Sequence, residues 1–471
     1  MKRLSTIMMC LFAMMAASLS AKAQEVTITL YPGWNWISYP KAEVLDINTA
    51  LGDFVPVNGD MIKAQFSTSS YINGYWRGGV THFMPGWGYM YYSNRTEVVS
   101  FVFGTPAPQL IVTTAEPTEI TANSATCGGN VSSGDGNYVF VLLRGICWGT
   151  TPNPTFNDNY VEVGNGIGSF TTLVTELTPN TTYYVRAFAV TESGTFYGDE
   201  KNLHTIPIGA INGIFSVSDM QQVYFSKGNL QYIGSASNPY WKFADNQWDY
   251  FGYNGQNSNS ATVDRDLFGW GTSGWDNGNT YYHPWDIDYS DGSLYGPLGN
   301  CDLTDTYVNS DWGVYNPISN GGNTINQWRT LTQQEWQYLF YSRITASGIR
   351  YVKAKVNGIS GLILLPDNWD ENVYSLSYTN QSHASFNSNE ISITQWTTLE
   401  NAGAIFLPCA GYRTGTSISY SGDSGYYWSS TSTNNTGAYF SFFYWDAVGA
   451  NYGLYYDRYY GRSVRLVQNV R

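Results

Sequence analysis

The chain has 471 residues, of which 13% are charged and 17% aromatic, and its formal net charge is −13. An acidic balance of this size disfavours nucleic acids and anionic membranes as partners, because both are bound through basic patches. The many aromatic residues argue against a disordered chain. A composition rich in Tyr, Trp, Gly and Asn favours β proteins with many turns over a helical enzyme.

The first 23 residues have the pattern of a signal peptide. Lys2 and Arg3 form a positively charged N-terminal region, and an apolar stretch covers residues 4–19. The sequence AKA at 21–23 then supplies the two small residues of a cleavage site. Gln24 would then begin the mature chain. No later stretch reaches about 18 continuous apolar residues. We therefore expect export to the extracellular space or the outer cell surface, with the periplasm as the alternative, and no transmembrane segment after cleavage.

Residues 25–104 form the first predicted module. Apolar and polar residues alternate over 26–31, which is a β-strand signal. Three motifs follow, GWNWISYP at 33–40, GDMIK at 59–63 and PGWGYM at 85–90. This set resembles modules found in secreted proteins of Gram-negative anaerobes, and the resemblance implies no activity. We expect a small β domain with a Trp-rich core, and the alternative is an exposed aromatic platform for a sugar.

A stiff, Pro-containing linker at 105–108 leads to the second module, residues 109–206. Short strands separated by Gly, Asn and Pro turns predict a β-sandwich. The segment LTPNTTYYVRAF at 177–188 resembles the E–F corner of a fibronectin type III domain, where a Tyr hydroxyl bonds back to the backbone. The resemblance implies a fibronectin type III-like sandwich with Trp148 in its core, serving as a spacer or adhesion module.

Residues 209–468 form the third module, whose first part is rich in Trp, Asn and Gly and predicts long loops. The sequence TQQE at 332–335 is a capping box, in which the Thr and Glu side chains each bond the backbone amide of the other residue. Trp336, Leu339 and Phe340 follow at helical spacing. The pattern predicts a short amphipathic helix.

Further elements of the third module follow from turn and cap signals. Residues 352–365 form a predicted hairpin, whose Asn-Gly pair at 357–358 favours a type I′ turn. Residues 395–402, followed by Gly403, form a predicted second helix. The closing strands are expected at 406–408, 427–431 and 462–467.

Five motifs occur in order along this module: WRTLTQQEW at 328–336, LLPD at 364–367, GAIFLPCAGYR at 403–413, YWSST at 427–431 and GRSVRLV at 461–467. Together they resemble the FISUMP (major paralogous domain) family and its relatives with a C-type-lectin-like fold. The resemblance implies a C-terminal α+β domain of that kind. The chain as a whole is then mainly β, with a small β domain, a sandwich and a C-type-lectin-like domain.

The relatives of this family include formylglycine-generating enzymes and variable proteins diversified by retroelements. The enzymes use paired cysteines near the end of the domain, whereas Cys409 is the only cysteine in that stretch. The resemblance therefore implies no enzymatic activity here. The Trp-Asn-Asp motif of calcium-dependent lectins is also missing, so calcium-dependent sugar binding is not expected.

The segment 420–460 holds fifteen aromatic residues among 41, with Ser, Asn, Gly and Asp at most other positions. Tyr and Trp supply contact area at low conformational cost, and the small polar residues supply adaptable hydrogen bonds, as in antibody paratopes. We predict a surface that binds an extracellular protein or glycan, and the alternative is that most rings pack the closing strands. The predicted ligand-binding residues are Asn434, Asn435, Tyr439, Tyr444, Asn451, Tyr452, Tyr455, Tyr456, Asp457, Tyr459 and Tyr460.

Two further functions remain as alternatives. The diversified positions of the variable proteins lie in this part of the domain and favour Tyr, Asn, Ser, Asp and Phe, so a diversified receptor-binding protein is the second hypothesis. A carbohydrate-active enzyme is the third, because Asp286 and Asp288 could flank a glycosidic bond. The simpler interpretation is that these two carboxylates lie on a surface loop or bind Ca²⁺.

Cysteine and histidine spacing offers no catalytic or metal-binding pattern. The four histidines are scattered and no C-x-x-C or H-x-x-x-H spacing occurs, so no catalytic residue, metal or cofactor is predicted. Cys127 and Cys147 could form a disulfide in an oxidising compartment. Alternatively, they are two buried thiols of one core.

Overall fold

The computed structural model describes residues 26–104, 110–133, 140–191, 194–252, 256–258, 260–275, 282–285, 296–297, 299–450 and 457–470. Strands dominate these residues, and helices are short, so the chain is mainly β with an α+β C-terminal part, as predicted. Contacts divide the chain into two compact units, and the second begins at Ile111. The predicted signal peptide (1–23) and linker (105–108) lie outside the described residues.

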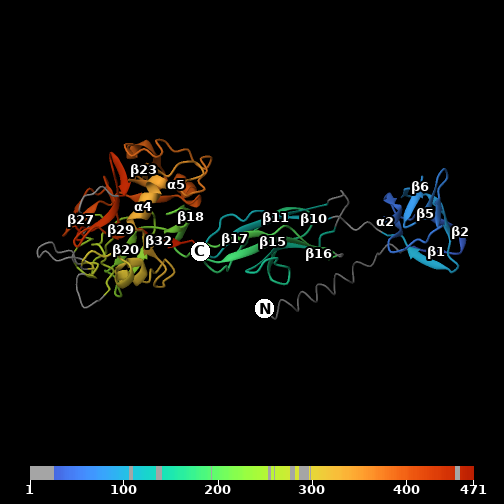
Figure 1. Ribbon diagram of the computed structural model, residues 1–471, viewed down its shortest axis with the longest axis horizontal. Coiled ribbons are helices and arrows are strands. Elements are labelled where there is room, and N and C mark those ends of the chain that lie inside the picture. Colours follow the sequence, from blue (N-terminus) through green and yellow to red (C-terminus); the bar gives the residue numbers. More distant parts are fainter. Residues whose placement is uncertain are drawn as a thin grey trace. The chain divides into compact units, whose positions relative to one another are not determined.

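The first module is built on a five-stranded antiparallel sheet with the strand order β2-β8-β4-β5-β6 (Figure 1, blue). Two small two-stranded sheets, β1-β9 and β3-β7, and helix α2 complete it. The bounds are β1 (Thr27–Leu30), β2 (Gly33–Ser38), β3 (Leu45–Asp46), α2 (Ile47–Leu51), β4 (Met61–Lys63), β5 (Thr68–Ile72), β6 (Tyr75–Gly78), β7 (His82–Phe83), β8 (Gly88–Ser93) and β9 (Val99–Val102).

The core of this module consists of Tyr, Phe and aliphatic side chains, so the prediction of a Trp-rich core is wrong. Ile37, Tyr89 and Tyr91 are buried on the inner face of the sheet, against Phe101 and Phe103. Three of its tryptophans are instead exposed: Trp34 at 46%, Trp36 at 80% and Trp87 at 49%. Trp34 and Trp36 lie two residues apart on β2 and therefore share one face of the sheet, which is the face turned away from the core.

The second module is a sandwich of two sheets, one with the order β10-β11-β14 and one with β13-β12-β15-β16, in which β17 also pairs with β15 (Figure 1). Its strands are β10 (Leu110–Thr114), β11 (Ala125–Ser133), β12 (Leu143–Gly149), β13 (Asn159–Glu162), β14 (Gly168–Val174), β15 (Thr182–Thr191), β16 (Gly194–Tyr197) and β17 (Lys201–His204). This arrangement is that of a fibronectin type III-like domain.

The predicted tyrosine corner is present. The backbone amide of Thr178 donates to the hydroxyl of Tyr183 at 2.9 Å, which confirms the expected bond. The core of the sandwich is aliphatic, with Ile146, Val185 and Ala187 fully buried. Trp148, expected in the core, is only half-buried.

Cys127 and Cys147 are free, fully buried thiols on strands of different sheets. The thiol of Cys147 donates to the carbonyl oxygen of Pro154 at 3.4 Å, in the loop that follows β12. Burial raises the pKa of both thiols to about 11. In this structure they act as small core residues.

The N-terminal and C-terminal strands of the third module lie in one sheet with the order β18-β19-β32-β22 (Figure 1). In this sheet β32, the last strand of the chain, pairs with β19, the second strand of the module. These strands are β18 (Ala210–Ser216), β19 (Gln222–Ser226), β32 (Leu466–Asn469) and β22 (Arg329–Thr330). Between them lie short elements joined by long loops, as the Trp-, Asn- and Gly-rich composition predicted. They are β20 (Leu230–Ile233), β21 (Tyr240–Phe243), η2 (Asp305–Ser310) and α3 (Trp312–Tyr315).

Both predicted helices of this module form. Helix α4 (Gln333–Gln337) starts at the predicted capping box of Thr332 and Glu335 and continues as the wider turn η3 (Tyr338–Ser342). Its apolar residues Trp336, Leu339 and Phe340 are fully buried, as predicted. Helix α5 (Ile393–Asn401) has a capping box of its own, formed by Ser392 and Gln395.

The predicted hairpin and the closing strands expected at 406–408 and 427–431 also form, whereas of the strand expected at 462–467 only residues 466–467 are part of a regular strand, β32. Strands β23 (Tyr351–Val356) and β24 (Ile359–Leu364) are joined by Asn357 and Gly358, whose φ angles of 50° and 78° suit a type I′ turn. The remaining elements are η4 (Phe386–Ser388), β25 (Glu390–Ile391), β26 (Ile405–Pro408), β27 (Tyr412–Thr414), β28 (Ser417–Ser419), β29 (Gly425–Ser432), β30 (Ala438–Tyr444) and β31 (Ala447–Ala450).

Tryptophans fill the core of the third module rather than that of the first. Six are fully buried: Trp270, Trp312, Trp328, Trp336, Trp396 and Trp428. The indole nitrogen of Trp270, in a loop, donates to the carbonyl of Ser429 in β29 at 2.7 Å, and that of Trp428, in β29, donates to the loop carbonyl of Phe268 at 2.7 Å. These two rings therefore fill core volume and also tie a loop to a strand.

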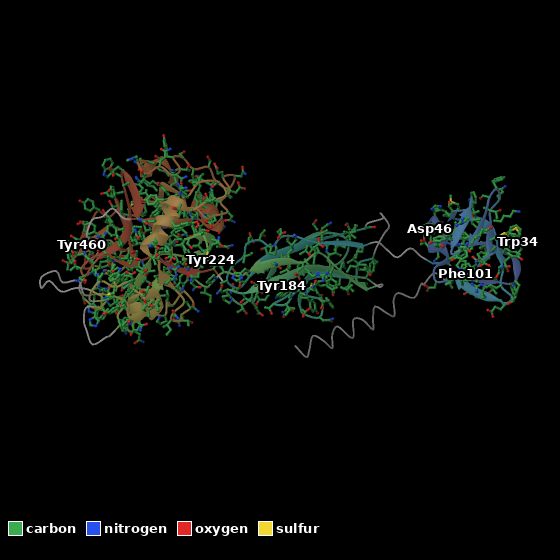
Figure 2. All side chains as sticks on the ribbon, viewed as in Figure 1. Trp34, Asp46, Phe101, Tyr184, Tyr224 and Tyr460 are labelled. Atoms are coloured by element: carbon green, nitrogen blue, oxygen red, sulfur yellow. The ribbon has the colours of Figure 1, made fainter. Side chains whose placement is uncertain are left out.

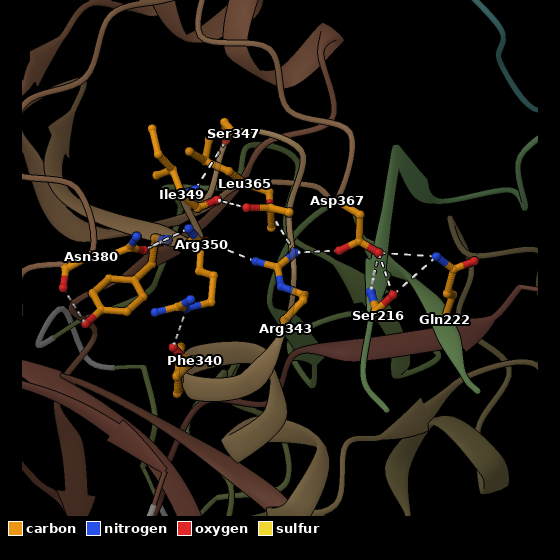
Figure 3. Close-up of polar contacts among 12 residues, drawn as sticks. Ser216, Gln222, Phe340, Arg343, Ser347, Ile349, Arg350, Leu365, Asp367 and Asn380 are labelled. Atoms are coloured by element: carbon orange, nitrogen blue, oxygen red, sulfur yellow. Dashed lines mark hydrogen bonds and ion pairs between the residues drawn. The ribbon is translucent and has the colours of Figure 1, made fainter. Parts of the chain in front are cut away.

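A buried ion pair fastens the hairpin β23–β24 to strand β18 (Figure 3). The guanidinium of Arg343 lies 3.1 Å from the carboxylate of Asp367 and donates to the carbonyl of Leu365 at 2.8 Å. The other carboxylate oxygen of Asp367 accepts from the amide and hydroxyl of Ser216 at 2.8 and 2.6 Å. Because the pair has these additional hydrogen bonds, neither charge is buried alone.

Candidate binding surface

Most of the aromatic residues in segment 420–460 that the structure describes are packed inside the third module. Strands β29, β30 and β31 form one antiparallel sheet, and five rings of the first two are buried: Tyr427, Trp428, Phe440, Phe442 and Phe443. Both faces of β30 are covered, because its consecutive residues 440–443 are all buried. The packing alternative therefore holds for these rings.

A second group of rings reaches the surface and forms what we call the tyrosine cluster: Tyr412, Tyr420, Tyr426, Tyr459 and Tyr460. Their ring centroids lie 5.8 Å apart for Tyr412–Tyr420, 5.5 Å for Tyr412–Tyr426, 5.3 Å for Tyr412–Tyr460 and 4.7 Å for Tyr459–Tyr460. Tyr420 is 57% exposed, and the other four are half-buried. Figure 2 labels Tyr460 on this module.

A buried cation, the guanidinium of Arg462, packs against rings of the cluster. The guanidinium of Arg462 is 1% exposed and lies 3.7 Å from the ring centroid of Phe440 and 4.8 Å from that of Trp428. It also lies within 6 Å of the rings of Tyr412, Tyr426 and Tyr460. Attraction between this cation and the ring faces holds the tyrosines in place from below, so the cluster is fixed before any ligand binds.

The local fold brings the cluster residues together from three chain segments. Tyr412 begins β27, Tyr426 lies in β29, and a bridge between Arg413 and Gly461 places Tyr460 beside them. Tyr420 follows β28 with a φ of 57°, a backbone conformation that L-residues rarely adopt. These contacts are long-range, and sequence spacing alone does not reveal them.

Two tyrosines of the cluster have a pKa above the usual value for tyrosine. Burial raises the pKa of Tyr412, and the neighbouring Tyr460 and Tyr420 raise it further. Burial and hydrogen bonds with Tyr460 and Asp457 raise the pKa of Tyr459. Their hydroxyls can therefore donate and accept hydrogen bonds without carrying charge.

The predicted binding residues are only partly brought together. Tyr459 and Tyr460 belong to the cluster, and Asp457 lies beside them. Asn434 is half-buried, and its side-chain oxygen accepts from the amides of Thr436 and Gly437 at 2.8 Å. The other described residues of the set are Asn435, which is exposed, and Tyr439 and Tyr444, which are half-buried. Asn451, Tyr452, Tyr455 and Tyr456 lie outside the described residues.

Three members of the cluster were missed by sequence reasoning. Tyr420 and Tyr426 were part of the aromatic segment but not of the predicted site, and Tyr412 precedes that segment. Its proximity depends on the bridge to Gly461. The one sequence signal was the position of Tyr412 within the motif GAIFLPCAGYR at 403–413.

Two buried carboxylates of the third module bond to backbone amides. Among the described residues, no three His, Cys, Asp or Glu side chains gather as a metal site requires. The buried carboxylate of Asp311 caps α3 and accepts from the amide of Thr330 at 2.8 Å, and burial raises its pKa to about 6. That of Asp266 accepts from the amide of Phe251 at 2.8 Å, and burial raises its pKa to about 6 as well. Asp286 and Asp288 lie outside the described residues.

No helix of the described ranges has the length and apolar character needed to cross a membrane.

Comparison with known proteins gives a family match for one part of the chain. Residues 373–467 match a family model described as "Domain of unknown function (DUF8237)". This range contains η4 and every element from β25 to β31, and therefore the whole tyrosine cluster. No curated protein matches the chain.

Solved structures similar to the chain include fibronectin type III domains. The sixth such domain of human fibronectin type III domain containing protein 3 is 21% identical, with 22% of this chain and 91% of that chain covered and a TM-score of 0.16. The sensor domain of the anti-sigma factor RsgI4 in Pseudobacteroides cellulosolvens is 14% identical, with 22% and 98% covered and a TM-score of 0.16.

Proposed function

We propose that this chain is an exported binding protein that recognises another protein through the tyrosine cluster of its third module. Export is supported by the signal-peptide pattern of residues 1–23. A C-type-lectin-like fold for the third module is supported by the order of the five FISUMP-like motifs. The single observation that carries the binding role is the tyrosine cluster itself, five partly exposed rings of which three lie within 6 Å of the buried Arg462.

The composition of the cluster suits recognition. Five neighbouring tyrosines present both apolar ring area and neutral hydroxyls, and tyrosine is enriched at protein interfaces for this reason. The rings are already ordered by Arg462 and by each other. Binding would therefore cost little conformational entropy.

The ring geometry favours a protein over a glycan at this surface. Tyr412 packs edge-to-face with Tyr460 at 89° and with Tyr426 at 76°. Each of the five rings contacts at least one other ring of the cluster, so little flat ring area is left open. A sugar ring stacks on an open flat face, whereas an uneven protein surface can use edges and hydroxyls.

The test is binding of the labelled mature chain to a microarray of extracellular and cell-surface proteins, with a glycan microarray in parallel. We expect saturable binding to at least one protein. Tyr420→Ala/Tyr459→Ala should weaken that binding at least about tenfold, because central aromatic residues dominate interface energies. Trp445→Ala is the matched control, since Trp445 is 75% exposed and lies outside the cluster.

A quadruple Tyr→Phe variant at 412, 420, 459 and 460 keeps the ring packing and removes the hydroxyls. It should fold and lose part of the affinity. Binding that persists in both cluster variants would contradict the proposed site. Binding only to glycans, or release of cleaved glycan, would contradict a protein-recognition role.

A further inference from the structure

One face of the five-stranded sheet in the first module is rich in exposed aromatic residues. In β2, Trp34 and Trp36 point away from the core, and Ile37 points into it. The strand register places Tyr92 opposite Trp34 and Met90 opposite Trp36 on β8. The indole of Trp34 packs edge-to-face on Tyr92, with centroids 5.2 Å apart, so this ring is braced (Trp34 is labelled in Figure 2).

The register continues this face across the sheet. Met90 pairs with Lys63 on β4, and Met61 pairs with Tyr92 and with Ser70 on β5, which in turn pairs with Arg77 on β6. Two parallel rows result, one from Trp36 to Lys63 and one from Trp34 to Arg77. Neighbouring strands lie about 4.8 Å apart, so Lys63 stands about 10 Å from Trp36 across the sheet.

The charges of this face are opposite in sign to that of the whole chain. Lys63 and Arg77, both exposed, are the charged residues of its two rows in the part of the chain that the structure describes. The chain as a whole carries a net charge of −13. A basic pair beside exposed aromatic rings on an acidic protein favours a ligand that carries both flat apolar faces and negative charge.

The geometry points to a binding site for acidic polysaccharides, which are chains of sugar rings bearing carboxylates, on this outer face of the first module. The indole faces of Trp34 and Trp36 would pack against the C–H faces of sugar rings, because a π face is electronegative. The two indoles lie on the same face about 6.6 Å apart along the strand, a spacing comparable to one sugar unit. Lys63 and Arg77 then pair with the carboxylates of neighbouring units.

Exposure supports a ligand rather than a structural role for these rings. Trp36 is 80% exposed and Trp34 46%, although burial of such a ring stabilises a fold. Grouped exposed aromatic residues usually mark an interaction site. The indole of Trp36 is mostly exposed, whereas the rings of the tyrosine cluster pack against one another, so the two surfaces suit different ligands.

The test is native affinity electrophoresis of the mature chain in gels that contain polygalacturonate, with dextran as the neutral comparison. We expect retardation by polygalacturonate and none by dextran. An acidic protein without a local site is repelled by a polyanion, so retardation itself reports a site. Trp34→Ala/Trp36→Ala should weaken the apparent affinity at least about tenfold. Lys63→Gln/Arg77→Gln should weaken it and reduce its dependence on salt.

Trp445→Ala serves as the control, because it removes a comparably exposed indole from another module. The cluster variant Tyr420→Ala/Tyr459→Ala should bind polygalacturonate normally, so this site and the proposed function can fail separately. The inference is overturned if polygalacturonate, alginate and hyaluronate all fail to retard the chain. It is also overturned if the double Trp variant binds as well as the wild type, or if dextran retards the chain equally.

Discussion

Buried arginines hold the loops of the third module together. Six of them are fully buried: Arg265, Arg343, Arg413, Arg458, Arg462 and Arg465. Arg458 donates to the carbonyls of Gly299 and Asn434 at 2.9 and 2.7 Å, and Arg265 donates to that of Val263 at 3.1 Å. A guanidinium has five donors, so one side chain can satisfy several loop carbonyls. These loops can therefore be ordered with little regular secondary structure.

Lys353 is a buried cation with a similar role. Its ammonium donates to the backbone carbonyls of Tyr444 at 2.5 Å, Trp445 at 3.2 Å and Ser382. The side chain is fully buried, and burial lowers its pKa to about 8, although Asp446 acts in the opposite direction. The turn between β30 and β31 is thus tied to strand β23.

The depressed pKa of Lys353 predicts a pH-dependent stability. The folded chain loses this proton near pH 8, and the unfolded chain near pH 10.5. Between these values the unfolded state binds more protons, so the contribution of Lys353 to the unfolding free energy increases as the pH rises. The difference between wild type and Lys353→Met in urea unfolding should be larger at pH 10 than at pH 7. A difference that stays constant or shrinks would contradict the assignment.

At the level of elements, cap and turn residues in the sequence correctly predicted a helix start and a hairpin turn. The capping box of α4 and the Asn-Gly turn between β23 and β24 form as predicted, because cap and turn residues act within a few positions of the backbone groups they bond. The second capping box, Ser392 with Gln395, was missed, although it has the same spacing. The wider turn η3 was also unforeseen, since it depends on packing against distant strands.

The two capping boxes allow a matched comparison. The hydroxyl of Thr332 accepts from the amide of Glu335 at 3.2 Å in a partly buried site, whereas that of Ser392 accepts from Gln395 at 3.4 Å in an exposed one. Thr332→Ala should therefore cost about 1 kcal/mol of unfolding free energy, and Ser392→Ala about half as much. Urea unfolding followed by tryptophan fluorescence measures both. Equal costs would show that burial does not strengthen the cap.

At the scale of the whole molecule, the cysteines predict how the chain responds to oxidation. Cys127, Cys147 and Cys409 are fully buried, and burial raises the pKa of each thiol. Cys301 is only half-buried, and its pKa is raised too, chiefly by burial. The thiolate is the reactive form. The three buried thiols of the native chain should therefore react slowly, and Cys301 should react fastest.

The measurement is labelling of the native mature chain with a thiol reagent at pH 8. One thiol should react within minutes and the other three only after denaturation, and Cys301→Ser should remove the fast phase. A fast phase that survives in Cys301→Ser would show that one of the buried sites opens. A chain isolated with a Cys127–Cys147 disulfide would show that the sandwich rearranges from the structure described.

The amino-acid sequence by itself determined the composition class, the signal-peptide pattern and most local elements of the third module. It also indicated the tyrosine corner at Tyr183 and the aromatic segment that contributes to the candidate site. Each of these depends on residues close together in the chain. Periodicity, caps and turns act over a few residues and can be read directly.

Only the tertiary structure decided which faces are buried. Trp34 and Trp36 were expected in the core, yet their side of the sheet is exposed, because the core of the first module is built on the opposite side. Tyr412 joins Tyr460 through a bridge spanning nearly fifty residues, and Arg462 lies beneath them. Burial and long-range contacts depend on how the elements pack. The sequence period of a strand (two residues) or a helix (3.6 residues) shows which side chains share a face, but it does not show what covers that face.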